Sequence, residues 1–357
     1  MKPDKGDFQM ANDKNRIQYI DIAKGIGIIL VVLIHLIFSS DRFQDISYLR
    51  NYVYSFHMPL FFIISGYCLF LKGQQHQQEW PLKEEIIRLC RKFLPCYFIW
   101  SMIYIILLKV TNQPVNIGER VRTTLVLKGI APLWFLIALF LCELVFLVLH
   151  RYFAKKDHYY YLFTLILFVL TILSGYYYEK SIDSSGGIFV FGFPVTWSAL
   201  VLFRSIACLG MLYTGYLLAK AFQKLKIGTI TAAIAGLALL GITFILVFIT
   251  QNYVNLHLFV IGNPIVFILT SICGSTAIIL LSYSIQAWGK GFALIGRYSL
   301  GIMILHYMPL RLMEYSTKAA FLITTNPYIA LLLALVMTLG SCAAILCLLN
   351  KKLYLLK

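Results

Sequence analysis

An apolar segment near the start of the chain reads Asp21-Ile-Ala-Lys24-Gly-Ile-Gly-Ile-Ile-Leu-Val-Val-Leu-Ile-His35. Between the lysine and the histidine it contains only glycine and aliphatic residues. A helix needs about 20 largely apolar residues to cross roughly 30 Å of bilayer hydrocarbon. Residues 22–38 therefore predict a membrane-spanning helix that has ionisable residues at both ends of its apolar run.

The rest of the chain has the same apolar character. Of its 357 residues, 60% are hydrophobic and only 13% are charged, whereas a soluble domain has about 25% charged residues. A globular fold of this size has too little interior to bury so much apolar surface, so lipid must be the solvent for most of it. The composition excludes a set of soluble domains and predicts an all-α, polytopic integral membrane protein.

About ten transmembrane helices are predicted from the apolar runs. These runs cover residues 22–38, 56–71, 93–110, 131–149, 159–177, 200–219, 228–250, 258–282, 292–313 and 327–349. The chain is thereby divided into a polar N-terminal segment (1–20), a membrane domain (21–350) and a short tail (351–357). Ser184-Ser185-Gly186-Gly187 marks the connection that we expect to be the most flexible.

The net charge of +16 comes from 31 Lys and Arg residues against 15 Asp and Glu residues. In a soluble protein this excess would suggest nucleic acid, but in a membrane protein it indicates topology. Most of the cations fall in the connections that share a side with the N-terminus. The positive-inside rule therefore places both termini in the cytoplasm, and we expect no nucleic-acid partner.

Three polar residues of the first span are candidates for function. Asp21 and Lys24 are three residues apart and can pair on one helix face. Lys24 and His35 are eleven residues apart, so they share a face and are separated by ~16 Å of rise. A histidine at this depth can take a proton from a hydroxyl. The alternative is a buried structural histidine beside an interfacial ion pair.

A second histidine begins the next span, in the sequence Ser55-Phe-His57-Met-Pro-Leu-Phe-Phe-Ile-Ile-Ser65-Gly-Tyr67. His57 is predicted at the outer end of this span, close to the depth that His35 reaches. Two histidines that converge near the outer leaflet make a better candidate site than either alone. The alternative for His57 is an ordinary interfacial residue.

A basic segment precedes the third span and reads Lys83-Glu-Glu-Ile-Ile-Arg88-Leu-Cys-Arg91-Lys92-Phe-Leu-Pro95. Arg88, Arg91 and Lys92 would line one side of a short helix that enters the span. Arginine and lysine at such spacing suit phosphate groups. The alternative is that these cations only fix the topology.

Several other polar residues are predicted at or near membrane depth. Glu143 and Arg204 are costly within spans and need partners. Trp134 opens the fourth span and is expected in the aromatic belt. Arg297 is predicted near the cytoplasmic end of the ninth span, with His306 nine residues further out.

The order of these motifs resembles acyltransferase family 3 of integral membrane proteins, and most closely its fucose 4-O-acetylase-like branch. The resemblance is strongest over about residues 16–96, in Asp21-x-x-Lys24-x10-His35, in the His57 to Tyr67 segment and in the basic segment that ends at Pro95. Sparser matches continue to about residue 310. Many members have arginine where this chain has Lys24. Lysine keeps the positive charge but lacks the bidentate fork of the arginine guanidinium group.

The resemblance implies transfer of an acyl group, usually acetyl, from cytoplasmic acyl-CoA to a hydroxyl of an extracytoplasmic glycan or lipid-linked sugar. Acyl-CoA would be a substrate, with no metal and no permanently bound cofactor, in a multi-pass protein of the bacterial cytoplasmic membrane. We expect His35 and His57 to be catalytic, and Lys24, Arg88, Arg91 and Lys92 to bind the CoA phosphates. Supporting roles are expected for Asp21, Ser65, Trp134, Arg204, Arg297 and His306.

Two questions stay open at this stage. The first concerns His35, which can act as a general base or carry the acyl group itself. In either case we expect the Gly25 and Gly27 face of its helix to line a dry channel for the pantetheine arm. The competing class is a proton-coupled transporter or exporter of a sugar or glycolipid, in which Asp21, Lys24, His35 and His306 form the path.

Overall fold

A computed structural model describes residues 17–46, 48–75, 81–111, 116–153, 156–185, 189–190, 193–194, 196–225, 227–307 and 311–350. Nine of its helices are long and apolar enough to cross a membrane, which confirms the all-α polytopic class. The predicted tail at 351–357, and the N-terminal segment up to residue 16, lie outside the described residues.

The elements follow one another along the chain with short connections. They are α2 (Gln18–Phe38), η1 (Asp41–Ile46), α3 (Tyr48–Tyr54), α4 (His57–Gln75), α5 (Leu82–Val110), α6 (Ile117–Leu125), η2 (Ala131–Leu133), α7 (Trp134–Phe153), α8 (His158–Ser185), β1 (Phe189–Val190), β2 (Phe193–Pro194), α9 (Thr196–Lys224), α10 (Thr229–Thr250), α11 (Pro264–Ser284), α12 (Lys290–Arg297), α13 (Ser299–Leu305), α14 (Leu312–Ile323) and α15 (Pro327–Asn350). The two strands form one antiparallel pair of two residues each.

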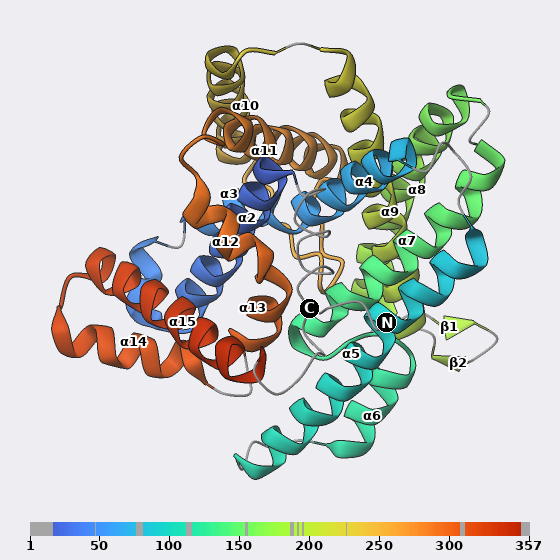
Figure 1. Ribbon diagram of the computed structural model, residues 1–357. Helices are drawn as coiled ribbons and strands as arrows, with labels where there is room; N and C mark the ends of the chain where they lie inside the picture. Colours follow the sequence, from blue (N-terminus) through green and yellow to red (C-terminus); the bar gives the residue numbers. More distant parts are fainter. Residues whose placement is uncertain are drawn as a thin grey trace, which may run out of the picture.

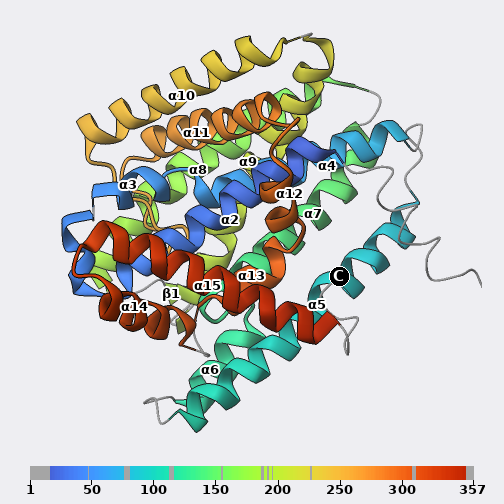
Figure 2. The same ribbon diagram turned by 60° about the vertical axis from the view of Figure 1, so that its left-hand side comes forward.

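The helices differ in how deeply they are buried in the protein. Of the most apolar stretch of each span, 83% is buried for Leu49–Gln74 and 67% for α2, but only 22% for α10. Figure 1 shows α2, α12 and α13 near the centre, and α10, α14 and α5 at the edge. Figure 2 shows α2 passing between α11 and α15. α2 and α4 therefore form the interior on which a site can be built, and α10 faces lipid.

Two pairs of glycines let helix backbones touch at this centre. A Cβ atom on Gly66 of α4 would collide with the carbonyl of Leu212 on α9, and one on Gly215 of α9 would collide with the carbonyl of Ile63. Gly25 of α2 and Gly296 of α12 meet in the same way. Small residues at such crossings are typical of membrane helices, because van der Waals packing replaces the hydrophobic effect there.

The predicted span 292–313 is wrong as a single helix. α12 ends at Arg297, α13 starts at Ser299, and α14 starts only at Leu312. Arg297 nevertheless forms an ion pair with Asp21 at one end of α2, and His306 contacts His35 near the other end. The two short helices thus accompany α2 over the same depth as a continuous helix would.

The start of the predicted span 258–282 also differs from the prediction. α11 begins at Pro264 rather than at residue 258, because the Asn263 side chain caps it and Gly262 has a positive φ of 50°. Residues 251–263 before it form a loop that is anchored in the core by Leu256, Phe259 and Ile261.

The basic segment is not a separate short helix. It forms the first turns of α5, which begins at Leu82. The connection expected to be flexible is also partly helical, because α8 extends to Ser185; Gly186 and Gly187 lie outside the described residues.

Candidate functional site

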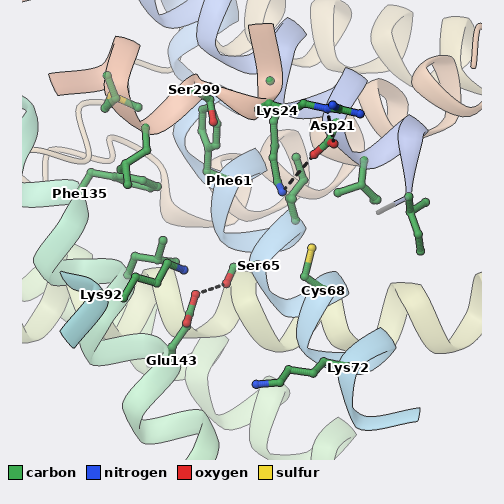
Figure 3. Close-up of a pocket in the computed structure, with 18 of the residues that line it drawn as sticks. Asp21, Lys24, Phe61, Ser65, Cys68, Lys72, Lys92, Phe135, Glu143 and Ser299 are labelled. Atoms are coloured by element: carbon green, nitrogen blue, oxygen red, sulfur yellow. Dashed lines mark hydrogen bonds and ion pairs between the residues drawn. The ribbon is translucent and has the colours of Figure 1, made fainter. Parts of the chain in front are cut away.

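A cavity of about 440 Å³ lies beside the N-terminal half of α2, and we call it the lysine cavity. Figure 3 shows charged side chains of α2, α4, α5 and α7 around it. Its lining comprises Ile17, Ile20, Asp21, Lys24, Phe61, Ile64, Ser65, Cys68, Leu71, Lys72, Lys92, Phe93, Phe135, Leu139, Glu143, Gly296, Arg297, Ser299, Leu300 and Met303. It combines charged groups with a wall of aliphatic and aromatic side chains.

One carboxylate organises the cations at the α2 side of this cavity. The Asp21 oxygens lie 3.7 Å from Lys24 Nζ and 3.7 Å from Arg297 Nε. The Asp21 side chain is 10% exposed, whereas those of Lys24 and Arg297 are 30% and 40% exposed. Two half-exposed cations therefore share one nearly buried anion, which leaves a net positive charge for an incoming anionic ligand. The predicted pairing of Asp21 with Lys24 is confirmed.

A buried carboxylate lies on another wall of the same cavity. Ser65 Oγ donates a hydrogen bond of 2.7 Å to Glu143 Oε1, and Lys92 lies on the same side of the cavity (Figure 3). Lys72 also lines the cavity and pairs with Glu85 of α5. The partner that Glu143 needs is thus Ser65 of α4. Neither Glu143 nor Lys72 was a predicted site residue, although a glutamate within an apolar span is a signal for a site.

A second cavity, of about 310 Å³, lies at the other end of α2, and we call it the histidine cavity. Its lining comprises His35, Phe38, Tyr54, His57, Met58, Ala131, Pro132, Trp134, Tyr253, Asn255, Leu256, His257, Met303 and Tyr307. Among these described residues there is no Lys, Arg, Asp or Glu. The polar groups that it offers are imidazole, phenol and amide groups, which hydrogen-bond without a formal charge when neutral.

His35 is held by His306 through a hydrogen bond that fixes its tautomer. His35 Nδ1 lies 2.8 Å from His306 Nε2, with the two rings nearly parallel at 9°. His306 Nδ1 lies 2.9 Å from the carbonyl oxygen of Ile302, which can only accept. Neutral His306 therefore carries its proton on Nδ1 and accepts at Nε2, so His35 donates from Nδ1. The remaining lone pair of His35 is on Nε2.

His57 lines the same cavity as His35, so the two histidines converge as predicted. His57 is buried, and its Nδ1 donates to the carbonyl oxygen of Val53, 2.9 Å away. Its Nε2 therefore has the lone pair as well. The Tyr54 ring packs against it with the centroids 4.9 Å apart.

Arg204 does not line either cavity but supports the histidine cavity from behind. It is fully buried, and its two terminal nitrogens donate to the carbonyl oxygens of Lys128 (3.0 Å) and His257 (3.1 Å). Its guanidinium carbon lies 4.8 Å from the Trp134 ring centroid. Arg204 thus ties the connection before α7 to the loop at 251–263.

Trp134 is 5% exposed and lines the histidine cavity. The expected position in an aromatic belt at the lipid interface is therefore wrong. The physical reason is Arg204, whose buried charge is stabilised by the face of the indole ring.

His257 is a residue of this cavity that sequence reasoning missed. Its ring stacks on Trp134 at an interplanar angle of 15°. Burial, followed by the positive charges of Arg204 and Lys128, lowers the pKa of His257 to about 4, so the ring is neutral at pH 7. No sequence pattern singles it out, because it directly precedes the apolar run that starts at residue 258 and resembles the start of a helix.

The remaining predicted residues divide between the cavity and the surface. Of the three α5 residues predicted to bind phosphate, Arg88, Arg91 and Lys92, only Lys92 lines the lysine cavity. Arg88 is exposed and forms an ion pair with Glu85, and Arg91 is also exposed. Gly25 and Gly27 pack against neighbouring helices instead of lining a channel, because Gly25 meets α12 and Gly27 meets Leu60 and Phe61.

Nine of the described helices are long and apolar enough to cross a membrane, and the lysine and histidine cavities lie between helices. These features define a multi-pass membrane protein that has its reactive groups in the interior. A family model described as an acyltransferase domain matches residues 17–347. The chain belongs to acyltransferase family 3 and is a membrane acyltransferase. The match is to the family as a whole, so the fucose 4-O-acetylase-like branch stays a prediction. No curated protein matches the chain.

Proposed function

We propose that this membrane acyltransferase transfers an acetyl group from cytoplasmic acyl-CoA to a hydroxyl of an extracytoplasmic or lipid-linked carbohydrate. The observation that carries the proposal is the arrangement of two cavities along α2, with cations beside Asp21 and histidines beside His35. The family match favours this function over the transporter or exporter that the sequence left open.

The lysine cavity suits the donor. Lys24, Lys92 and Arg297 can contact the phosphates of CoA, since ammonium and guanidinium groups bind phosphate by charge-assisted hydrogen bonds. The aliphatic and aromatic wall can receive the uncharged pantetheine arm. The positive-inside rule supports a cytoplasmic position for this cavity, because it opens beside the N-terminus of α2.

The histidine cavity suits the reaction. The His35 Nε2 lone pair would take the proton of the acceptor hydroxyl as the oxygen attacks the thioester carbonyl. The C–O bond forms, the C–S bond breaks, and the proton passes from His35 to the CoA thiolate. The fixed tautomer leaves the Nε2 lone pair available to a general base and to a nucleophile alike, and His57 would assist from the same cavity.

The same cavity suits a neutral hydroxyl-rich acceptor. Its imidazole, phenol and amide groups hydrogen-bond to hydroxyls, and none of its described lining residues is an acid or a strong base. Arg50 lies beside the Phe38 and Tyr253 rings of this lining, at 5.7 Å and 5.1 Å. A cation in this position supports a glycan that has a phosphate or carboxylate outside the reacting sugar.

The test uses the protein in lipid nanodiscs, with acetyl-CoA and a panel of lipid-linked and free saccharides. The substitution His35→Ala should lower the rate of acetyl transfer by about 10² to 10⁴-fold, which is the usual contribution of a general base. CoA binding should stay the same, because His35 lies outside the lysine cavity. His158→Ala is the matched control, since His158 is exposed and lines neither cavity.

Each outcome has a defined meaning. A folded His35→Ala protein that transfers acetyl at the wild-type rate would exclude the catalytic assignment. Acyl-CoA binding without transfer to any saccharide would exclude a carbohydrate acceptor. Saccharide transport that needs no acyl-CoA would favour a transporter and contradict the proposed acyl transfer.

A further inference from the structure

The two cavities share one residue of their walls. Among the described residues, Met303 of α13 is the only one that lines both the lysine cavity and the histidine cavity. Its side chain is 3% exposed. Ser299 and Leu300, one turn earlier, line only the lysine cavity, and Tyr307, one turn later, lines only the histidine cavity.

The neighbouring helices change from one cavity to the other at the same level. On α4, Met58 lines the histidine cavity and Phe61, one turn further on, lines the lysine cavity. On α7, Trp134 lines the histidine cavity and the next residue, Phe135, lines the lysine cavity. The Phe61 and Phe135 rings pack together with their centroids 5.7 Å apart. Met303, Phe61 and Phe135 thus line the lysine cavity at the level where it borders the histidine cavity, and we call these three residues the collar.

We propose that Met303 is the specificity-determining residue that selects acyl groups by their cross-section. This inference rests on the proposed function, in which the thioester reaches His35 from the lysine cavity. The acyl group is the tip of the pantetheine arm, so it must pass the collar first. A methionine side chain is unbranched and flexible, and it can move aside for a narrow group more readily than for a broad one.

This geometry separates cross-section from chain length. A straight acyl chain has the same width at every carbon, so a collar restricts acetyl and butyryl groups to a similar extent. A group branched next to the carbonyl, such as isobutyryl, is wider at the point that must pass. We therefore expect the wild-type protein to discriminate against isobutyryl-CoA more strongly than against butyryl-CoA, although the two have the same number of carbons.

The experiment compares acetyl-, butyryl- and isobutyryl-CoA as donors for the protein in nanodiscs, with kcat/KM as the readout. In Met303→Ala we expect the isobutyryl to acetyl ratio to rise about tenfold or more, since even one extra methylene in a hydrophobic pocket changes discrimination by about tenfold or more. The butyryl to acetyl ratio should change much less. Ile304→Ala is the matched control, because Ile304 is buried on the same helix and lines neither cavity.

The outcomes separate this inference from the proposed function. An isobutyryl to acetyl ratio in Met303→Ala equal to that of wild type, or an equal rise in Ile304→Ala, would overturn the selection role of Met303. Absence of transfer from acetyl-CoA by the wild-type protein would instead overturn the proposed function. Should Met303→Ala fail to fold in a thermal assay, Met303→Val leaves a smaller void, and a rise in its ratio is expected in the same direction.

Discussion

At the scale of single residues, the arrangement around His35 differs from that of an isolated histidine in an apolar helix. Its Nδ1 proton is directed to His306, whose own orientation is set by the Ile302 carbonyl. A backbone carbonyl in a helix cannot change its acceptor character, so the chain of two hydrogen bonds has one direction. His306 is accordingly a positioning residue for His35 in the proposed reaction, and it contacts neither substrate cavity directly.

This arrangement predicts a specific response to substitution of His306. In His306→Ala the His35 proton loses its acceptor and can shift to Nε2, so we expect kcat to fall by about 10²-fold, within the range for loss of a general base. KM for acyl-CoA should not change. His306→Gln restores an acceptor oxygen and should recover part of kcat. Steady-state kinetics of the three proteins measure both effects, and equal kcat values for the alanine and glutamine variants would contradict the positioning role.

At the scale of elements, the site depends on helix crossings that need glycine. α4 carries His57 and Ser65, and its position is set by the contact of Gly66 with α9. The contact of Gly25 with Gly296 sets α12 against α2 and so brings Arg297 to Asp21. Both crossings place polar groups from distant parts of the chain at one cavity.

A matched pair of substitutions tests the first crossing. Gly66→Ala forces a methyl group against the Leu212 carbonyl and should lower both the melting temperature and the acyl transfer rate. Gly241→Ala, on α10, places the methyl group in open space, where it should be neutral or stabilise by about 0.5–1 kcal/mol through lower backbone entropy of the unfolded chain. Thermal unfolding in one detergent compares them, and similar melting temperatures would contradict the close packing of α4 on α9.

At the scale of the whole molecule, the topology depends on whether the broken segment crosses the membrane. The nine continuous spanning helices of the described residues would, by themselves, place the ends of the chain on opposite sides of the membrane. α12 and α13 together run from the Asp21 end of α2 to the His35 end. They therefore count as a tenth crossing, and both ends should be cytoplasmic.

Reporter fusions test this count. Alkaline phosphatase, which is active only outside the cytoplasm, should be inactive when fused after Lys357 and active when inserted in the turn at Thr324–Asn326 between α14 and α15. A fluorescent protein that folds only in the cytoplasm should give the opposite pattern. An active phosphatase after Lys357 would mean that α12 and α13 do not cross.

Much of the architecture could be predicted because the bilayer imposes it locally. An apolar run such as 22–38 must become a helix, since no water is present to satisfy its backbone groups. The same local rule failed for 258–282 and 292–313. At the first, the residues before Asn263 are anchored in the core as a loop; at the second, the helix is interrupted after Arg297, which pairs with Asp21.

The membrane class, the approximate spans and the candidates Lys24 and His35 follow from the sequence alone, because apolar runs and costly intramembrane charges are visible one segment at a time. Which polar groups meet is visible only in the folded structure. Glu143 with Ser65, Trp134 between Arg204 and the histidine cavity, His306 behind His35, and Met303 between the cavities all join residues from different helices. Such contacts arise from helix packing, which no single segment of sequence encodes.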